Sequence, residues 1–265
     1  MQLPPFVLLP QPSSAIGPVP SGVRYRDGLR RLASSYYIRH LWMPVAAWVA
    51  LTAVLMGLHW DFWLADRVYA MEGHAWTLQS GYLTQDLIHA AGRQASKDAW
   101  FVLLLIAIGS ALVPAGRQWF RPLTYLLVAT LLSTAVVGAL KRWTNMDCPW
   151  DLLRYGGHHL YYGLFTARPA ALGHGQCFPA GHAGAGYAWI ALYFFFAATR
   201  PRWRGWGLGL GLAVGLVFGI AQQLRGAHFL SHDLWSLMTC WLVALALYRL
   251  MLWNRPAPAI LRSRP

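Results

Sequence analysis

The densest group of chemically reactive side chains lies at residues 225–233, with the sequence RGAHFLSHD, between two long apolar runs. Ionisable groups beside segments at membrane depth are costly, so a functional site is the first hypothesis for them. Arg225 can grip phosphate oxygens with its planar fork of donors. His228 is a candidate nucleophile, and His232 or Asp233 is a candidate to hold its imidazole in one tautomer. The structural alternative is an interfacial Arg–Asp pair with hydrogen-bonded histidines.

Two further polar stretches stand at the ends of apolar runs. Lys141, one of only two lysines in the chain, follows one such run; an interfacial lysine that snorkels to lipid headgroups is the simpler interpretation of this residue alone. Residues 177–184, CFPAGHAG, precede another run. Proline and glycine before a helix let backbone N–H groups approach an anion at its positive end. Gly181 and His182 stand at that end, although a capping or core histidine fits equally well.

Metal binding is a second chemistry to weigh, because His158, His159 and His174 lie in the long polar stretch between these two sites. Their spacing matches no zinc pattern. The three cysteines of the chain fit neither a CxxC motif nor a disulfide scaffold. We therefore expect no metal and no cofactor.

Together, the three stretches resemble the type 2 phosphatidic acid phosphatase (PAP2) superfamily. Its members carry Lys-x6-Arg-Pro, then Pro-Ser-Gly-His, then Ser-Arg-x5-His-x3-Asp at the outer ends of six spans. The order and the helix positions match over about residues 40–252, but each motif is altered. The residues that depart from the pattern are Cys148 for the first arginine, Ala180 for the serine, Gln222 for the second arginine and His232 for the aspartate.

These departures leave assignments open. Arg142 and Arg154 are the candidates to supply the charge of the first arginine. Arg225 lies three residues before His228, about one helical turn from the expected position if this region is helical. Taking His232 as the nucleophile instead corrects the arginine spacing but leaves a serine where the aspartate should be. We favour His228.

The resemblance implies covalent phosphoryl transfer without a metal. His228 would attack phosphorus to form a phosphohistidine, and His182 would protonate the leaving oxygen and then activate water. Lys141, Arg225 and N–H groups near Gly181 would stabilise the charge on the phosphoryl oxygens.

The substrate so implied is a lipid phosphate or diphosphate, with lipid A, undecaprenyl diphosphate and phospholipid phosphates as candidates. Two alternatives stay open. A lipid phosphotransferase would use the same intermediate, and a catalytically inactive relative would bind lipid headgroups or act as a scaffold.

Composition supports a membrane protein, because 57% of the 265 residues are hydrophobic and only 12% are charged. The net charge of +13 would also suit a nucleic-acid partner. That partner is not expected, since the basic residues interrupt apolar runs and form no single polar face.

The elements that must position the site are therefore helices. We expect an all-α, six-transmembrane-helix bundle, because six apolar runs are long enough, or nearly so, to cross a bilayer. These runs are residues 41–58, 99–115, 122–140, 183–199, 205–224 and 234–252.

Charge predicts the orientation of this bundle. The tails and two of the turns carry 14 of the 22 basic residues and a single acid, whereas the three opposite connections are neutral overall. By the positive-inside rule, both termini are cytoplasmic. We thus expect a disordered basic tail at residues 1–39, a membrane domain at 40–252 and a second tail at 253–265. The protein would lie in a bacterial inner membrane, with the active site facing the periplasm.

Cys148 and Cys177 both fall on the outward side, each beside one of the motifs. In an oxidising periplasm they would form a disulfide that ties the first motif to the second. The chain-entropy model gives it about 3–4 kcal/mol of stabilisation. The alternative is two free thiols. Cys240, within the last apolar run, is expected to serve packing.

Overall fold

The computed structural model describes residues 34–253, and the chain divides into two units, Met1–Trp42 and Met43–Pro265. Of the first unit, residues 34–42 are described; they are helical and include the π-helical turn η1 (Ile38–Trp42). The tails expected at residues 1–39 and 253–265 lie mostly outside the described residues.

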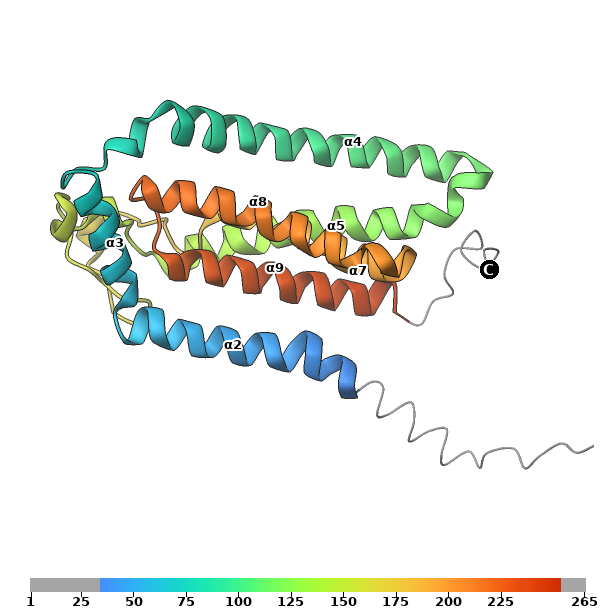
Figure 1. The fold of residues 1–265 in the computed structure, drawn as a ribbon, viewed down its shortest axis with the longest axis horizontal. Coiled ribbons are helices and arrows are strands. Elements are labelled where there is room, and N and C mark those ends of the chain that lie inside the picture. The colour runs from blue at the N-terminus through green and yellow to red at the C-terminus, as the bar shows by residue number, and fades with distance from the viewer. Residues whose placement is uncertain (1–33, 254–265) are drawn as a thin grey trace, which may run out of the picture. The chain divides into compact units, whose positions relative to one another are not determined.

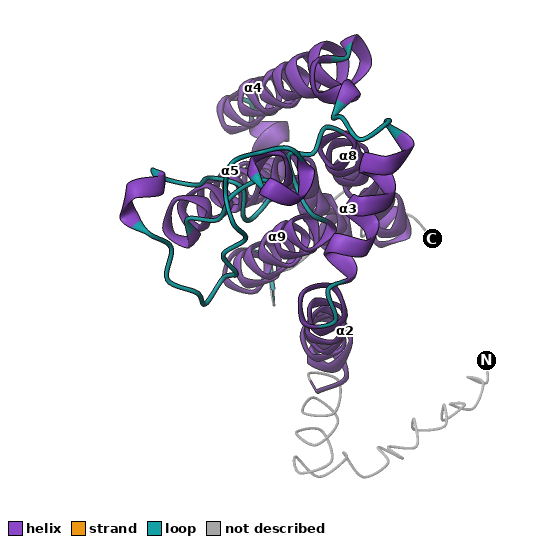
Figure 2. Cartoon of the chain, turned by 90° about the vertical axis from the view of Figure 1, so that its left-hand side faces the viewer, coloured by secondary structure: helices purple, strands orange, loops and turns teal. Residues whose placement is uncertain are grey.

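The second unit is built from helices and loops. The long helices are α4 (Gly92–Leu112), α5 (Arg117–Thr144), α8 (Arg204–Leu224) and α9 (Leu230–Met251). The shorter helices that bear on the site are α2 (Met43–Thr52), α3 (Trp60–Met71), η3 (Thr77–Ser80), η4 (Tyr82–Ala91), α6 (Gly181–Tyr187), η9 (Ala188–Ile190) and α7 (Ala191–Thr199). The described residues form no strand (Figure 2). Two residues of one loop, Leu152 and His159, make an isolated bridge. The expected all-α class is confirmed.

Five helical stretches are long and apolar enough to cross a membrane, which fits an integral membrane protein. They are Ser34–Gly57, Tyr82–Leu112, Pro114–Asp151, Pro201–Leu224 and Leu230–Met251. The sixth expected span, residues 183–199, is helical as α6, η9 and α7, but it is not among these five. Its first turns contain glycines and a histidine, which lower its mean hydropathy.

The start of the second span differs from the expectation of residue 99, because the helix already begins at Tyr82. We expected the polar residues before position 99 in an outward connection, with helical character at residues 82–89 and no continuous helix into the span. Those residues recur at every fourth position, which places them along one face of a helix and does not interrupt it. They are Gln85, His89, Arg93 and Lys97.

Glycines let α8 lie against α6 and α7 at the distance of backbone contact. They recur at every fourth residue of α8, at Gly207, Gly211, Gly215 and Gly219. A Cβ atom on Gly215 would lie 2.0 Å from the ring of Tyr187, and one on Gly186 would lie 2.7 Å from the Cα atom of Gly215. Small residues at this spacing are the usual means of close helix packing in membranes.

One end of the bundle carries α3 and the loop of residues 145–180, next to the end of α5 and the start of α9 (Figure 1). An aromatic cluster joins α3 to this loop and to the α8–α9 turn; its members include Phe62, Ala65, Tyr69, Trp76, Leu152, Tyr155 and Phe229. The turn needs glycine at position 226, where φ is +69° and a Cβ atom would lie 2.4 Å from the Trp76 ring. The backbone N–H of Trp150 donates to the carbonyl of this glycine at 2.9 Å.

Candidate active site

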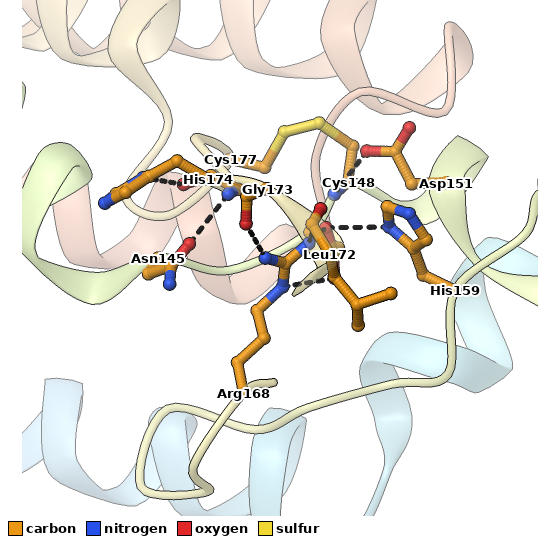
Figure 3. A network of polar contacts seen from close by, with 11 residues as sticks. Asn145, Cys148, Asp151, His159, Arg168, Leu172, Gly173, His174 and Cys177 are labelled. Atoms are coloured by element: carbon orange, nitrogen blue, oxygen red, sulfur yellow. Dashed lines mark hydrogen bonds and ion pairs between the residues drawn. A yellow bond between two sulfur atoms is a disulfide. The ribbon is translucent and has the colours of Figure 1, made fainter. Parts of the chain in front are cut away.

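Hydrogen bonds hold the end of α5 against the segment that leads into α6. The Cys177 N–H donates to the carbonyl oxygen of Met146 at 3.0 Å. The Thr144 hydroxyl donates to the carbonyl of Phe178. The sulfur atoms of Cys148 and Cys177 are joined in a disulfide beside these bonds (Figure 3). The first and second sequence motifs are therefore tied together at their backbones.

The start of α6 is in turn bonded to α9. The Ala180 N–H donates to the carbonyl oxygen of His232 at 3.1 Å, and the Ser236 hydroxyl donates to the carbonyl of Ala180 at 2.8 Å. The Asp61 carboxylate of α3 accepts the Ser231 N–H at the first turn of α9, 2.9 Å away, where a negative charge suits the helix end. All three motif segments thus meet at one end of the bundle.

Lys141 lies beside the N-terminus of α6. A Cβ atom built on Gly181 would lie 3.7 Å from the Lys141 ammonium nitrogen. No hydrogen bond or ion pair joins this ammonium to another described residue. Its charge nevertheless acts electrostatically on four imidazoles, those of His89, His182, His228 and His232. The structure brings Lys141 together with the histidines that the sequence singled out.

His228 lies in the α8–α9 turn and is 5% exposed. Its Nδ1 atom lies 3.4 Å from Nδ1 of His232. With Nδ1 facing His232, Nε2 is the ring nitrogen that remains available to a ligand. Burial, with the neighbouring His232 second, lowers the pKa of His228 well below its ordinary value. The ring is therefore neutral near pH 7, as a nucleophile must be.

The structure places His232, and not Asp233, against His228. The Asp233 carboxylate accepts a hydrogen bond from the Gln223 amide, and it lies so close to α8 that a Cβ atom on Gly219 would be 2.4 Å from Oδ2. Asp233 therefore ties α9 to α8. Of the two sequence candidates for holding the His228 ring, His232 is the one in contact with it.

Arg225 is 7% exposed, and all of its partners are neutral. Its Nε atom donates to the Gln79 carbonyl at 2.8 Å, and its Nη2 atom donates to the Gln85 amide oxygen. The Nη1 atom donates to Nδ1 of His89 at 3.0 Å and to the Gln222 amide oxygen at 3.1 Å. Burial alone lowers the pKa of Arg225. Because it bonds to Gln222, the guanidinium lies beside the position where the family motif has its arginine.

His89 belongs to the site, although the sequence analysis did not select it. Its ring stacks on His182, with centroids 3.8 Å apart. Its Nδ1 atom receives donors from both Gln222, at 2.9 Å, and Arg225. Since Nδ1 is the acceptor, a neutral His89 carries its proton on Nε2. The signal that could have found it is the four-residue spacing of polar side chains at the start of the second span.

Two arginines proposed from the sequence lie elsewhere. Arg142 is exposed on α5, with its guanidinium near Gly138. Arg154 pairs with Asp66 of α3, at 2.7 Å for Nε to Oδ1 and 2.6 Å for Nη2 to Oδ2. This pair, whose arginine side chain is 55% exposed, also holds the Tyr155 hydroxyl. The structure does not bring either arginine to His228.

The loop of residues 145–180 contains a second polar centre, shown in Figure 3. Arg168 grips Asp147 with two hydrogen bonds, of 2.9 Å from Nε and 2.7 Å from Nη2, and both side chains are only 4% exposed. It also donates to the carbonyls of Leu172 and Gly173. His159 completes the set, with its Nδ1 atom 3.1 Å from Asp147. This centre holds the loop in shape.

The other polar groups of this loop do not form an open metal site. His174 is exposed and bonds to the carbonyl of Gly175, and His158 is also exposed. Among the described residues, one group of three potential ligands lies close together, Cys148, Asp151 and Cys177. Two of those ligand atoms are the sulfurs of the disulfide, so they are not free to bind a metal.

Comparison with known proteins gives one match. A family model described as the PAP2 superfamily matches residues 122–256, which include all three motif segments. No curated protein and no solved structure matches the chain.

Proposed function

The chain belongs to the PAP2 superfamily, and from this premise we propose that it is a membrane-embedded phosphatase that hydrolyses a lipid phosphate or diphosphate. Members of the superfamily are phosphatases, so a phosphatase-type activity is the general expectation. The lipid substrate, the intermediate and the side of the membrane are the specific parts of the proposal.

One observation carries it. Lys141 and Arg225 lie at the same end of the bundle as His182, His228 and His232. Among residues 34–253, no acid is bonded to either cation or acts on its charge. Burying cations without an opposite charge is unfavourable, and a bound anion would remove that cost. A phosphate group is an anion that an arginine fork, an ammonium and a helix N-terminus all bind well.

In the first step, Nε2 of His228 attacks phosphorus. The bond from phosphorus to the lipid oxygen breaks, and His182 donates a proton to that oxygen. Burial, followed by His89 and the nearby cations, lowers the pKa of His182 in the free protein, so His182 takes up this proton as the phosphate anion binds beside it. His232 holds the His228 ring through Nδ1, which is the role that a carboxylate has in many triads. Lys141, Arg225 and the N–H groups at Gly181 stabilise the charge on the phosphoryl oxygens.

In the second step, water replaces the histidine. His182, now neutral, takes a proton from the water as its oxygen attacks phosphorus, and the bond to Nε2 of His228 breaks. Phosphate leaves, and His182 is again protonated. Neither step needs a metal, because the cations of the chain already face the transferred group.

We place this site at the outer face of a bacterial inner membrane. The support is the distribution of basic residues, which leaves the tails and two turns strongly positive and the connections that carry the site neutral overall. A lipid could then bring its phosphate to the site by lateral diffusion, without leaving the bilayer.

The direct test is phosphate release by the purified full-length protein in detergent, with lipid phosphates as substrates. We expect His228→Ala to lower kcat by about 10³-fold or more, and His182→Gln to lower it by about 10²–10⁴-fold. A mass increase of one phosphoryl group on the peptide containing His228 should be detectable in the His182→Gln protein. Full activity in His228→Ala would refute the nucleophile, and activity lost to EDTA and restored by zinc would refute the metal-free mechanism.

The pH profile gives an independent check. Because burial lowers the pKa of His228 well below 6.5, its ring stays neutral, and nucleophilic, as the pH falls through that value. The acid limb of kcat/KM, which reports the free enzyme, should therefore lie clearly below pH 6.5. An acid limb at or above that pH would mean that a more exposed group is the one being titrated.

A further inference from the structure

A cavity of about 580 Å³ lies between α4, α5 and the α6–η9 segment. It starts about one helical turn from the site, because Arg93 follows His89 by four residues and Ala185 follows His182 by three. Most of its lining is apolar, with Trp100 and Leu131 among the residues. The volume is typical of a ligand pocket.

The cavity opens on the outer surface of the bundle. Phe101 and Leu131, which line it on α4 and α5, are 58% and 55% exposed. In a bilayer this surface faces lipid chains. A lipid chain could therefore enter the cavity between α4 and α5 and extend along its lining, which runs for about 12 Å between Arg93 and Phe101.

Two cations stand at the end of the cavity nearest the site. Arg93 and Lys97 are four residues apart on α4, and they continue the four-residue spacing of His89 on the preceding η4. No hydrogen bond or ion pair joins either of them to another described residue. The charge of Arg93 acts electrostatically on both His89 and His182. These cations therefore lie between the histidines and the apolar part of the cavity.

We propose that the preferred substrate is a lipid diphosphate, with its chain in this cavity and its inner phosphate bound by Arg93 and Lys97. This rests on the proposed function, which places the outer phosphate between Lys141 and Arg225. A monophosphate would use only that first pair of cations. Arg93 and Lys97 form a second pair of cations on the side where the lipid chain lies, and their charge matches that of a second phosphate. Both residues lie outside the matched residues 122–256, so the family model does not assign this second pair of cations.

The chemistry balances with water as the only co-reactant. His228 attacks the outer phosphorus, the bond to the bridging oxygen breaks, and that oxygen leaves on the lipid monophosphate with a proton from His182. Arg93 and Lys97 hold the charge of this leaving group. Water then releases inorganic phosphate from the phosphohistidine. The products are one lipid monophosphate and one phosphate.

The test compares two substrates with the same chain, farnesyl diphosphate and farnesyl monophosphate. We expect the wild-type protein to prefer the diphosphate by about tenfold or more in kcat/KM, since a charged hydrogen bond typically changes binding by this factor. Lys97→Gln should lose most of that preference and change monophosphate hydrolysis by less than about threefold. Arg93→Gln should also lose most of the preference, with an added change in both rates because the charge of Arg93 acts on His182. The matched control is Arg67→Gln, an exposed arginine of α3 that should change neither rate.

Binding separates failure of this proposal from failure of the phosphatase function. The ligands are a farnesyl methylenediphosphonate, which resists hydrolysis, and the farnesyl monophosphonate, each measured by calorimetry with protein shown to be folded and monodisperse. If the wild type hydrolyses neither substrate but binds the diphosphonate about tenfold more tightly, the subsite stands and the catalytic proposal fails. If the two ligands bind equally, or if Arg93→Gln weakens both equally, the second phosphate site is refuted.

Discussion

Arg168 and Arg225 are both buried arginines near the same end of the bundle, but their partners differ in charge. The Arg168 guanidinium forms a bidentate ion pair with Asp147 and also donates hydrogen bonds to carbonyl oxygens of the loop. The Arg225 guanidinium bonds to two amide oxygens, one carbonyl and one imidazole, and to no carboxylate in the part of the chain that the structure describes. The Asp147 carboxylate thus balances the charge of Arg168, whereas none of these partners balances the charge of Arg225.

The difference separates a structural arginine from one that can bind substrate. A buried cation with a carboxylate partner holds two segments together, and its removal leaves that carboxylate exposed to an apolar environment. A buried cation with neutral partners is oriented by them but still attracts an anion. The neighbours of an arginine, more than its burial, thus indicate its role, and changes at three arginines test this rule.

The largest effect on stability should come from Arg168→Met, which leaves Asp147 buried with His159 as its remaining side-chain partner. We expect a loss of about 3–5 kcal/mol in the free energy of unfolding, measured in mixed detergent micelles. The matched variant is the double change Arg168→Met with Asp147→Leu, which removes both charges and should recover much of the loss. If the double variant is no more stable than the single one, the pair is not what holds this loop.

The next effect should be on catalysis. Arg225→Gln removes the charge from the phosphate site, and we expect kcat to fall by about 10²–10³-fold, or about 2.7–4 kcal/mol in the activation barrier. The free energy of unfolding should change less than in Arg168→Met. Arg225→Lys serves as the control, because it keeps the charge and loses the fork, and should be intermediate. A fully active but unstable Arg225→Gln protein would assign this arginine to structure.

The smallest effect should follow Arg154→Gln. Its pair with Asp66 is exposed, and such pairs contribute about 0.2–1 kcal/mol to stability. Chemical denaturation should detect at most this loss, and phosphate release should stay within about twofold of wild type. A loss of activity above tenfold would contradict the comparison and would restore Arg154 as a candidate phosphate ligand.

The helical class could be predicted from the sequence because apolar runs of about 20 residues have few other stable structures in a membrane. The start of the second span could not, because the apolar run begins only at residue 99, after the charged residues Arg93 and Lys97. A hydropathy average does not show that polar side chains lie along one face. The separation of α6, η9 and α7 also depends on local backbone geometry that the composition of residues 181–199 does not reveal.

The motif residues of the site could be located because a few side-chain types recur at set spacings around phosphate chemistry. What spacing could not show is which groups contact them. The choice between His232 and Asp233 depended on the direction of each side chain from α9. Two partners of Arg225, Gln85 and His89, come from η4, more than 130 residues earlier in the chain. Such contacts are set by tertiary packing.

The glycine row of α8 has a mechanical consequence. Where two helices touch at their backbones, no side chain is left between them to compress or repack, so the spacing of α6 and α8 is nearly incompressible. His182 of α6, the proposed proton donor, and the arginine at the end of α8 share that spacing, and an error of about 1 Å can cost a reaction 10²-fold. A change in lateral pressure of the bilayer should therefore act on the exposed α4 side, where we propose that a lipid chain enters, and should leave the distance between His182 and Arg225 unchanged.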